Sequence, residues 1–154
     1  MELKDKLTTV GKVEIILTNV KTGKITRSWA DNLVTDIGKI SMADHYRGAT
    51  ASNKGIVTYC ALGTDDTAPE PENIELGTEI FRKLISVRSF NGNSAILETF
   101  FTVDEGNGTL KEAGLFGDDA SGVADSGTLF NHLAISRTKT TSDTLTLRWF
   151  MSFG

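Results

Sequence analysis

Short apolar runs separated by turn-rich gaps are the feature that most constrains the fold of this 154-residue chain. The last third shows the pattern best, because Leu110–Phe116, Leu129–Ser136 and Leu145–Phe153 are divided by segments rich in Gly, Asp and Ser. Runs of this length, with turn signals every 8–12 residues or so, are typical of sandwiches and barrels. The pattern predicts a mainly β protein, either an antiparallel β-sandwich or an open barrel.

The same alternation occurs nearer the N-terminus. Val13, Ile15 and Leu17 alternate with other residues at the period of a strand with one buried face, and a turn with Gly23 follows. Further apolar runs predict strands over residues 25–33, 56–63, 80–90 and 95–103. Together with the three C-terminal runs, these segments give about eight strands.

One segment, residues 36–47, has the spacing of a helix. Thr35 or Asp36 can cap its first turn, and Gly48 can end it. Ile37 and Ile40 fall at helical spacing and predict the buried face. We therefore expect one short helix within a single β-rich domain over residues 11–154, preceded by a polar N-terminal arm over residues 1–10.

Charge and apolar content argue against several classes of partner. The net charge of −4 and the scattered basic residues disfavour general binding to nucleic acid. No apolar run reaches 18 residues, so we predict no contact with a membrane. The one cysteine, Cys60, cannot form an intrachain disulfide, and its apolar surroundings predict a buried thiol.

We find no pattern that predicts a reaction centre. His45 and His132 are far apart in sequence and lack the spacing of metal ligands. No nucleophile elbow and no phosphate-binding glycine loop occurs. Paired carboxylates of a glycosidase are a weak alternative, because a few acidic residues near strands are expected by chance. We predict no enzyme activity, no catalytic residue, no metal and no cofactor.

Two loops stand out from the strands. Residues 64–77 form a long acidic segment that holds both prolines, and loops of this length usually contact something. Residues 117–127 superficially resemble a calcium loop, but the alternating oxygen donors and the distal Glu are missing. A surface loop is the simpler interpretation, and weak calcium binding stays open.

Six residues are candidates for contacts with other protein chains. Four are aromatic residues that could anchor an interface, and two form a charged pair at the spacing i, i+3. The aromatic residues are Trp29, Trp149, Phe150 and Phe153, and the charged pair is Glu79 and Arg82. A salt bridge within the chain is the other interpretation of the charged pair. Phe150 lies on the opposite face of its strand from the main apolar stripe, and exposed strand edges tend to pair with other chains. We therefore predict a homo-oligomer, with a trimer as the first guess.

The order of several short motifs resembles a known family. The motifs run through most of the chain and cover residues 32–39, 61–69, 76–82, 112–116, 127–130 and 145–153. In this order they resemble small structural proteins of tailed bacteriophages and prophages, described as tail-fibre, tail-collar or virion proteins. The resemblance covers about residues 11–153.

The resemblance implies an assembly role and offers no catalytic or binding residue to carry over. It implies a virion protein, made in the cytoplasm of the host bacterium, that joins other virion proteins at the tail, baseplate or fibre base. A capsid decoration protein that reinforces the head is one alternative. A carbohydrate-binding module of a receptor-binding apparatus is another, and it predicts glycan binding that depends on Trp29, Trp149 or Glu112.

Overall fold

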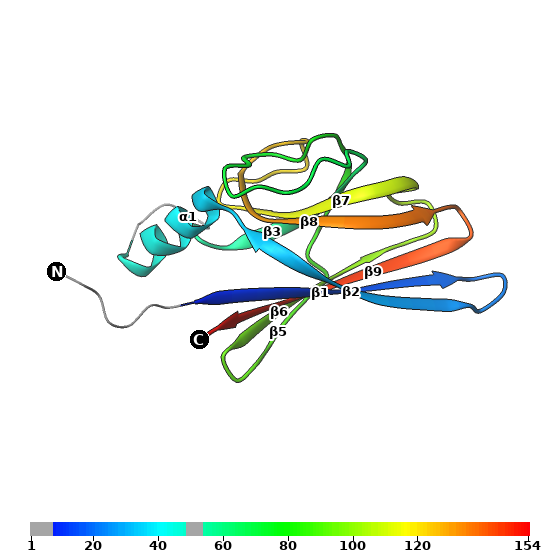
Figure 1. Cartoon of the computed structure of the whole chain (residues 1–154), viewed down its shortest axis with the longest axis horizontal. Coiled ribbons are helices and arrows are strands. Elements are labelled where there is room, and N and C mark those ends of the chain that lie inside the picture. Colours follow the sequence, from blue (N-terminus) through cyan, green and yellow to red (C-terminus); the bar gives the residue numbers. More distant parts are fainter. Residues whose placement is uncertain (1–7, 49–53) are drawn as a thin grey trace.

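The structure is a computed structural model that describes residues 8–48 and 54–154. Over these residues the chain forms one antiparallel sheet of nine strands, curled into a half-barrel, and one short helix (Figure 1). The strands and the helix are β1 (Thr9–Asn19), β2 (Ile25–Val34), α1 (Asp36–Tyr46), β3 (Val57–Gly63), β4 (Glu79–Leu84), β5 (Val87–Asn91), β6 (Ser94–Phe101), β7 (Gly108–Gly117), β8 (Thr128–Lys139) and β9 (Asp143–Phe153). The predicted mainly β fold with a single helix is confirmed.

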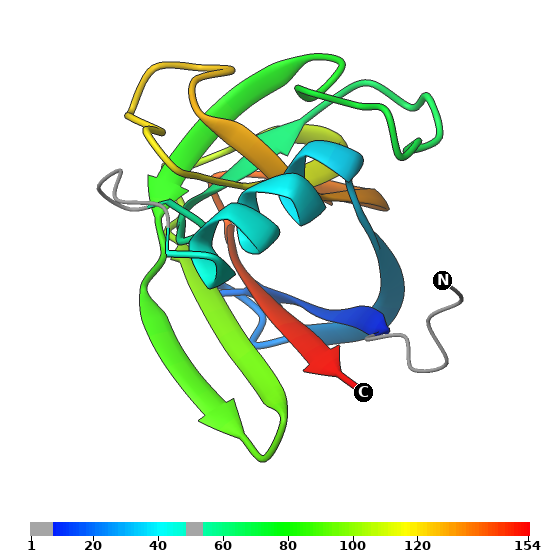
Figure 2. The ribbon, with the colours of Figure 1, turned by 90° about the vertical axis from the view of Figure 1, so that its left-hand side faces the viewer.

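The strands follow the order β4-β3-β7-β8-β2-β1-β9-β6-β5. β2 joins two parts of this sheet, because residues 25–32 pair with β1 whereas Leu33 and Val34 pair with β8. We call β2-β1-β9-β6-β5 the open half, since no described loop or helix lies over its outer face. We call β4-β3-β7-β8 the covered half, because loops and α1 lie over it (Figures 1 and 2).

The single strand predicted over residues 80–90 is two strands, β4 and β5, and this is why the sheet has nine strands where about eight were predicted. Strand β4 pairs with β3 and ends at Leu84, and after Ile85 and Ser86 the chain continues as β5 beside β6. The backbone N–H of Ile85 still donates to Thr58 O of the covered half, and that of Ser86 donates to Glu98 O of the open half. One continuous segment therefore forms both edges of the sheet.

The core lies between the inner faces of the two halves. The open half contributes Val13, Leu147 and Trp149, and the covered half contributes Leu62 and Leu115, all fully buried. On β9 the buried residues alternate with partly exposed ones, as a strand with one buried face requires, whereas Leu62 and Leu115 have buried neighbours because the covered half is covered on its outer face too. Cys60 belongs to the same core, so the predicted burial of its thiol is confirmed.

The helix begins where it was predicted, but it packs through another face. Thr35 is the N-cap, and its Oγ1 accepts from the backbone N–H of Gly38 at 3.0 Å. The buried helix residues are Gly38 and Ser41, whereas Ile40 is 62% exposed. The expected apolar face is therefore wrong at Ile40, because the helix lies close to the backbone of β8, where only small side chains fit.

None of the predicted arm's first seven residues falls within the described part of the chain. Strand β1 begins at Thr9, so the last two residues of the predicted arm belong to the sheet. Over the described residues, no helix has both the length and the apolar character needed to cross a membrane.

Candidate functional site

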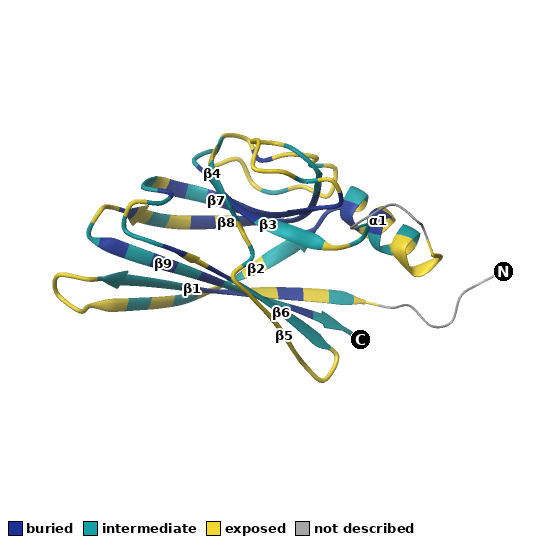
Figure 3. Cartoon of the chain, turned by 180° about the vertical axis from the view of Figure 1, so that it is seen from behind, coloured by how far each residue is buried: buried dark blue, intermediate teal, exposed yellow. Residues whose placement is uncertain are grey.

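The outer face of the open half carries a group of apolar side chains. Strand alternation directs them away from the core, and they come from four neighbouring strands: Ile16, Trp29, Ile96, Phe100 and Phe150. We call this group the outer patch. Trp29 is 58% exposed, and its ring reaches across β1 to lie 5.5 Å from the ring of Phe150, measured between centroids. Figure 3 shows partly buried and exposed residues along the strands of this half, with buried ones between them.

A row of alternating charges crosses the outer patch. Arg27 pairs with Glu14 at 2.7 Å, Glu14 with Arg148 at 3.7 Å, and Arg148 with Glu98 at 2.8 Å. The pKa of the Arg148 guanidinium is raised, chiefly by its hydrogen bond to Glu98. The row neutralises its own charges, so the outer patch can meet another surface without burying an unpaired ion.

The predicted contact residues are not in one place. Trp29 and Phe150 lie together in the outer patch. Phe153 is half-buried at the end of β9, on the wall of an apolar cavity. Trp149 is fully buried in the core, so its side chain has no surface to offer a partner, because β9 alternates and Trp149 faces the opposite way from Phe150.

Glu79 and Arg82 form a salt bridge within the chain. The Arg82 Nε to Glu79 Oε1 distance is 2.6 Å, and the two side chains are 3% and 1% exposed. The guanidinium lies 4.4 Å from the centroid of the Phe116 ring and donates to the backbone oxygens of Ser121 and Ser126. This pair therefore fastens residues 118–127 to β4 and is not available to a neighbouring chain.

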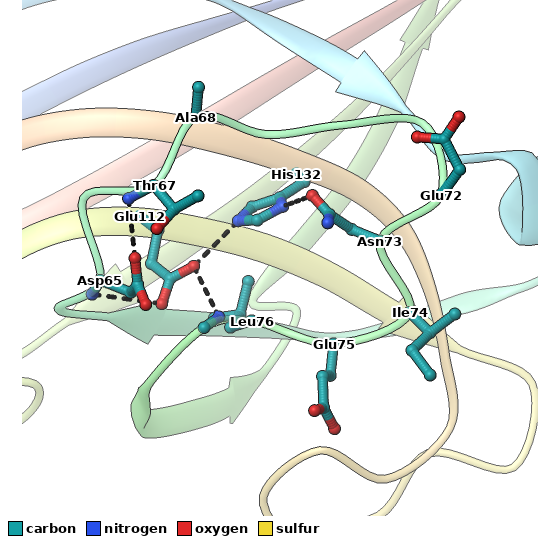
Figure 4. Close-up of a pocket in the computed structure, with 11 residues that line it drawn as sticks. Asp65, Thr67, Ala68, Glu72, Asn73, Ile74, Glu75, Leu76, Glu112 and His132 are labelled. Carbon is teal, nitrogen blue, oxygen red and sulfur yellow. Dashed lines mark hydrogen bonds and ion pairs between the residues drawn. The ribbon is translucent and has the colours of Figure 1, made fainter.

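A buried polar centre lies under the loop of residues 64–78 on the covered half (Figure 4). Glu112 on β7 and His132 on β8 are 1% and 4% exposed, and Nε2 of His132 lies 2.9 Å from Glu112 Oε2. The Glu112 carboxylate also accepts from the backbone N–H groups of Gly77 at 3.0 Å and Thr78 at 2.8 Å. One carboxylate thus fixes the end of the loop to the sheet.

The histidine fixes the middle of the same loop. Nδ1 of His132 lies 2.8 Å from Asn73 Oδ1, which also accepts from the backbone N–H of Glu70 at 2.7 Å. The ring of His132 therefore lies between two oxygen-bearing side chains, Asn73 of the loop and Glu112 of the sheet, and bridges them.

A polar cavity of about 350 Å³ adjoins this centre. Its rim carries Asp65, Glu72 and Glu75, and Figure 4 shows Glu72 and Glu75 pointing away from the Glu112–His132 pair. The pKa of Asp65 is lowered, mainly by its hydrogen bonds with Thr67. Across residues 8–48 and 54–154, no group of three or more His, Cys, Asp or Glu side chains is placed to hold a metal ion.

In the loop of residues 117–127, which was considered for calcium binding, the first aspartate, Asp118, is hydrogen-bonded to other parts of the chain. The Asp118 carboxylate accepts from Ser41 Oγ at 2.6 Å, Thr128 Oγ1 at 2.6 Å and the Gly55 backbone N–H at 2.8 Å, with Lys54 Nζ at 3.3 Å. Burial acts to raise the pKa of Asp118, but these hydrogen bonds outweigh it and lower the pKa. Asp118 therefore joins α1, the segment just before β3, and β8, and its carboxylate does not point outward from its loop.

Comparison with known proteins gives no further guide, since no family model, curated protein or solved structure matches the chain.

Sequence reasoning missed the Glu112–His132 centre. The two residues are 20 positions apart, and they meet because β7 pairs with β8 in a register that sets Gly114 opposite His132 and Glu112 opposite Ala134. The sequence did place a carboxylate and an imidazole on two consecutive predicted strands, which could have indicated that the two side chains meet. Only the pairing register, which a bulge between Leu110 and Glu112 modifies, decides that they touch.

Proposed function

We propose that this chain is a non-enzymatic structural protein of a tailed-phage virion that assembles with copies of itself. The observation that carries the proposal is the outer patch, in which the exposed Trp29 packs on Phe150 across a self-neutralising row of charges. Exposed apolar groups rimmed by polar residues are typical of protein–protein contact sites. The order of the sequence motifs supports the virion setting, at the tail, baseplate or fibre base.

The charges of the open half favour a second copy as the partner. On this face Lys12, Arg27 and Arg148 balance Glu14, Asp31 and Glu98, whereas the whole chain carries a net charge of −4. Two copies can therefore bring these faces together with less repulsion than at other surfaces. A closed oligomer, with a trimer as the first candidate, would bury the outer patch of every copy.

Sedimentation velocity over a range of concentrations tests the assembly. We expect the wild-type chain to form a discrete oligomer and Trp29→Ser to weaken it at least tenfold, because large buried aromatic residues dominate interface energies. Thr26→Ser, a change on the inward side of the same strand, is the matched control and should leave the oligomer intact. A wild-type monomer at all concentrations would contradict self-assembly.

Immunogold labelling of phage particles tests the virion setting. Label at the tail tip or neck supports the proposed location, and label over the head would move the assignment to capsid decoration. Absence of label on every particle would overturn the virion assignment.

The exposed indole of Trp29 also makes carbohydrate binding testable, since aromatic faces can stack on sugar rings. Saturable binding on a glycan array that Trp29→Ser abolishes would favour the carbohydrate-binding alternative. The other two residues of that alternative, Trp149 and Glu112, are buried and lie outside the outer patch.

A further inference from the structure

An apolar cavity opens at the end of the half-barrel, between α1 and the β5–β6 hairpin. Its volume is about 250 Å³, and its walls are largely apolar: Val34, Met42, Leu97, Phe130, Met151 and Phe153. A cavity of this size has room for a single aliphatic side chain. We call it the end cavity.

One cation stands at the rim of the end cavity. Arg88 on β5 lies opposite Leu97, which in turn lies opposite the buried Trp149, so this register places Arg88 on the core-facing side of the sheet. Arg88 makes no ion pair or hydrogen bond with the residues that the structure describes, although it is one of the residues that line the cavity. Phe90, two residues along the same strand, is 81% exposed. The rim therefore suits an apolar side chain accompanied by a carboxylate.

The loop over the covered half presents that combination. Ile74 is 61% exposed and lies between the exposed carboxylates of Glu72 and Glu75 (Figure 4). We call residues 72–75 the acidic knob. Neither Glu72 nor Glu75 forms an ion pair with the residues that the structure describes, so the negative charge of the knob is not neutralised within the chain.

The acidic knob is held in a fixed shape. Asn73 at its centre is bonded to His132, and Gly77 just beyond it is bonded to Glu112. A segment fixed before binding loses less conformational entropy when it docks. Through these bonds, the buried Glu112–His132 pair keeps Ile74 exposed at the surface of the loop.

We propose that the acidic knob of one copy docks in the end cavity of a second copy, with Ile74 in the cavity and Glu72 or Glu75 against Arg88. This inference rests on the proposed self-assembly and specifies a second contact, distinct from the outer patch. The two surfaces differ, so the contact is heterologous and continues from copy to copy into a ring or a filament.

A mixing experiment tests this head-to-tail contact. Every chain carries Trp29→Ser, so that the outer patch contributes little and the remaining association reports the second contact. Ile74→Asp removes the knob and Arg88→Glu alters the cavity rim, and both positions are exposed enough for the variants to fold. Each variant alone should associate at least tenfold more weakly than the Trp29→Ser parent, by sedimentation velocity.

The mixture of the two variants decides the geometry. An intact knob on one variant can still meet the intact cavity of the other, so a 1:1 heterodimer that grows no further is expected. A chain that carries both Glu75→Arg and Arg88→Glu has no native charge pair left, so recovery of its association would report the exchanged charges.

Three results would overturn the inference. A Trp29→Ser parent that stays monomeric while the wild type assembles would remove the second contact and leave the proposed function standing. Association that neither Ile74→Asp nor Arg88→Glu changes would do the same. A wild type that never assembles would overturn both this contact and the self-assembly on which it rests.

Discussion

At the scale of single residues, Glu112 has the largest structural role. Its buried carboxylate accepts hydrogen bonds from Gly77, Thr78 and His132, which join the loop to two strands. A carboxylate offers two oxygens to these donors, whereas a carboxamide offers one oxygen and adds hydrogens that face other hydrogens.

Glu112→Gln is therefore expected to destabilise the fold by about 3 kcal/mol, the upper end of the range for leaving a buried hydrogen-bonding group without its partner. Urea unfolding followed by circular dichroism would measure the change. Glu75→Gln, an exposed change in the same loop, should alter stability by less than about 0.5 kcal/mol. Equal effects of the two variants would contradict the role assigned to Glu112.

Asp118 predicts how stability depends on pH. Because its pKa is lower in the folded chain than in the unfolded one, the carboxylate adds stability that is present above the ordinary Asp value of about 3.9. This contribution is lost as the pH falls from there through the pKa of the folded state.

Asp118→Asn should therefore cost about 1–2 kcal/mol at pH 7 and progressively less as the pH falls below about 4. The substitution keeps the backbone, since Asn tolerates the φ of 58° at this position. Thermal unfolding of both chains from pH 7 to pH 3 would give the difference. A gap between them that stays constant with pH would refute the assignment.

At the scale of elements, the helix shows what sequence patterns could and could not predict. Its position follows from Thr35 and Gly48, which act locally at the two ends. Its buried face does not, because a Cβ at Gly38 would lie 2.8 Å from the backbone of Phe130, and this close approach exists only in the folded chain.

The strands likewise include some that the sequence predicted and some that it did not. Alternation and turn residues placed the β1–β2 and β5–β6 hairpins, but the run over residues 80–90 carries no Gly or Pro to mark its break at Ile85 and Ser86. That break follows from curling of the sheet. The Glu112–His132 centre was likewise unpredictable, since it depends on the register between β7 and β8.

Gly38→Ala tests the helix packing. Alanine favours a helix by about 1 kcal/mol over glycine, so a stabilising effect would be expected at an exposed site. Here we expect a loss of about 1–3 kcal/mol, because the added methyl group overlaps the β8 backbone. Lys39→Ala, at the exposed neighbouring position, is the control and should be close to neutral. Denaturant unfolding of both variants measures the contrast.

At the scale of the whole molecule, the two tryptophans report on assembly. Trp149 is fully buried in the core, whereas Trp29 is 58% exposed in the outer patch. An aqueous quencher such as acrylamide therefore reaches only one of them in an isolated chain.

We expect acrylamide quenching of the wild-type fluorescence to fall as the protein concentration rises, because assembly through the outer patch covers Trp29. Trp29→Phe leaves Trp149 alone, so its quenching should be several-fold weaker and independent of concentration. Steady-state fluorescence measures both. Quenching of the wild type that is the same at every concentration would argue against burial of Trp29 on assembly.

The pairing of β1 with β9 gives the molecule a directional mechanical strength. Thr9 lies opposite Phe153 at one end of this ladder, and Asn19 lies opposite Asp143 at the other. Force applied through Thr9 and Phe153 would load the hydrogen-bonded pairs one after another, so the strands would unzip at low tension. Force applied through Thr9 and Asp143 would load the whole ladder at once in shear. Neighbouring proteins bound near Thr9 and Asp143 would therefore find the chain mechanically stiff. Neighbours bound near Thr9 and Phe153 would separate β1 from β9 at a lower force.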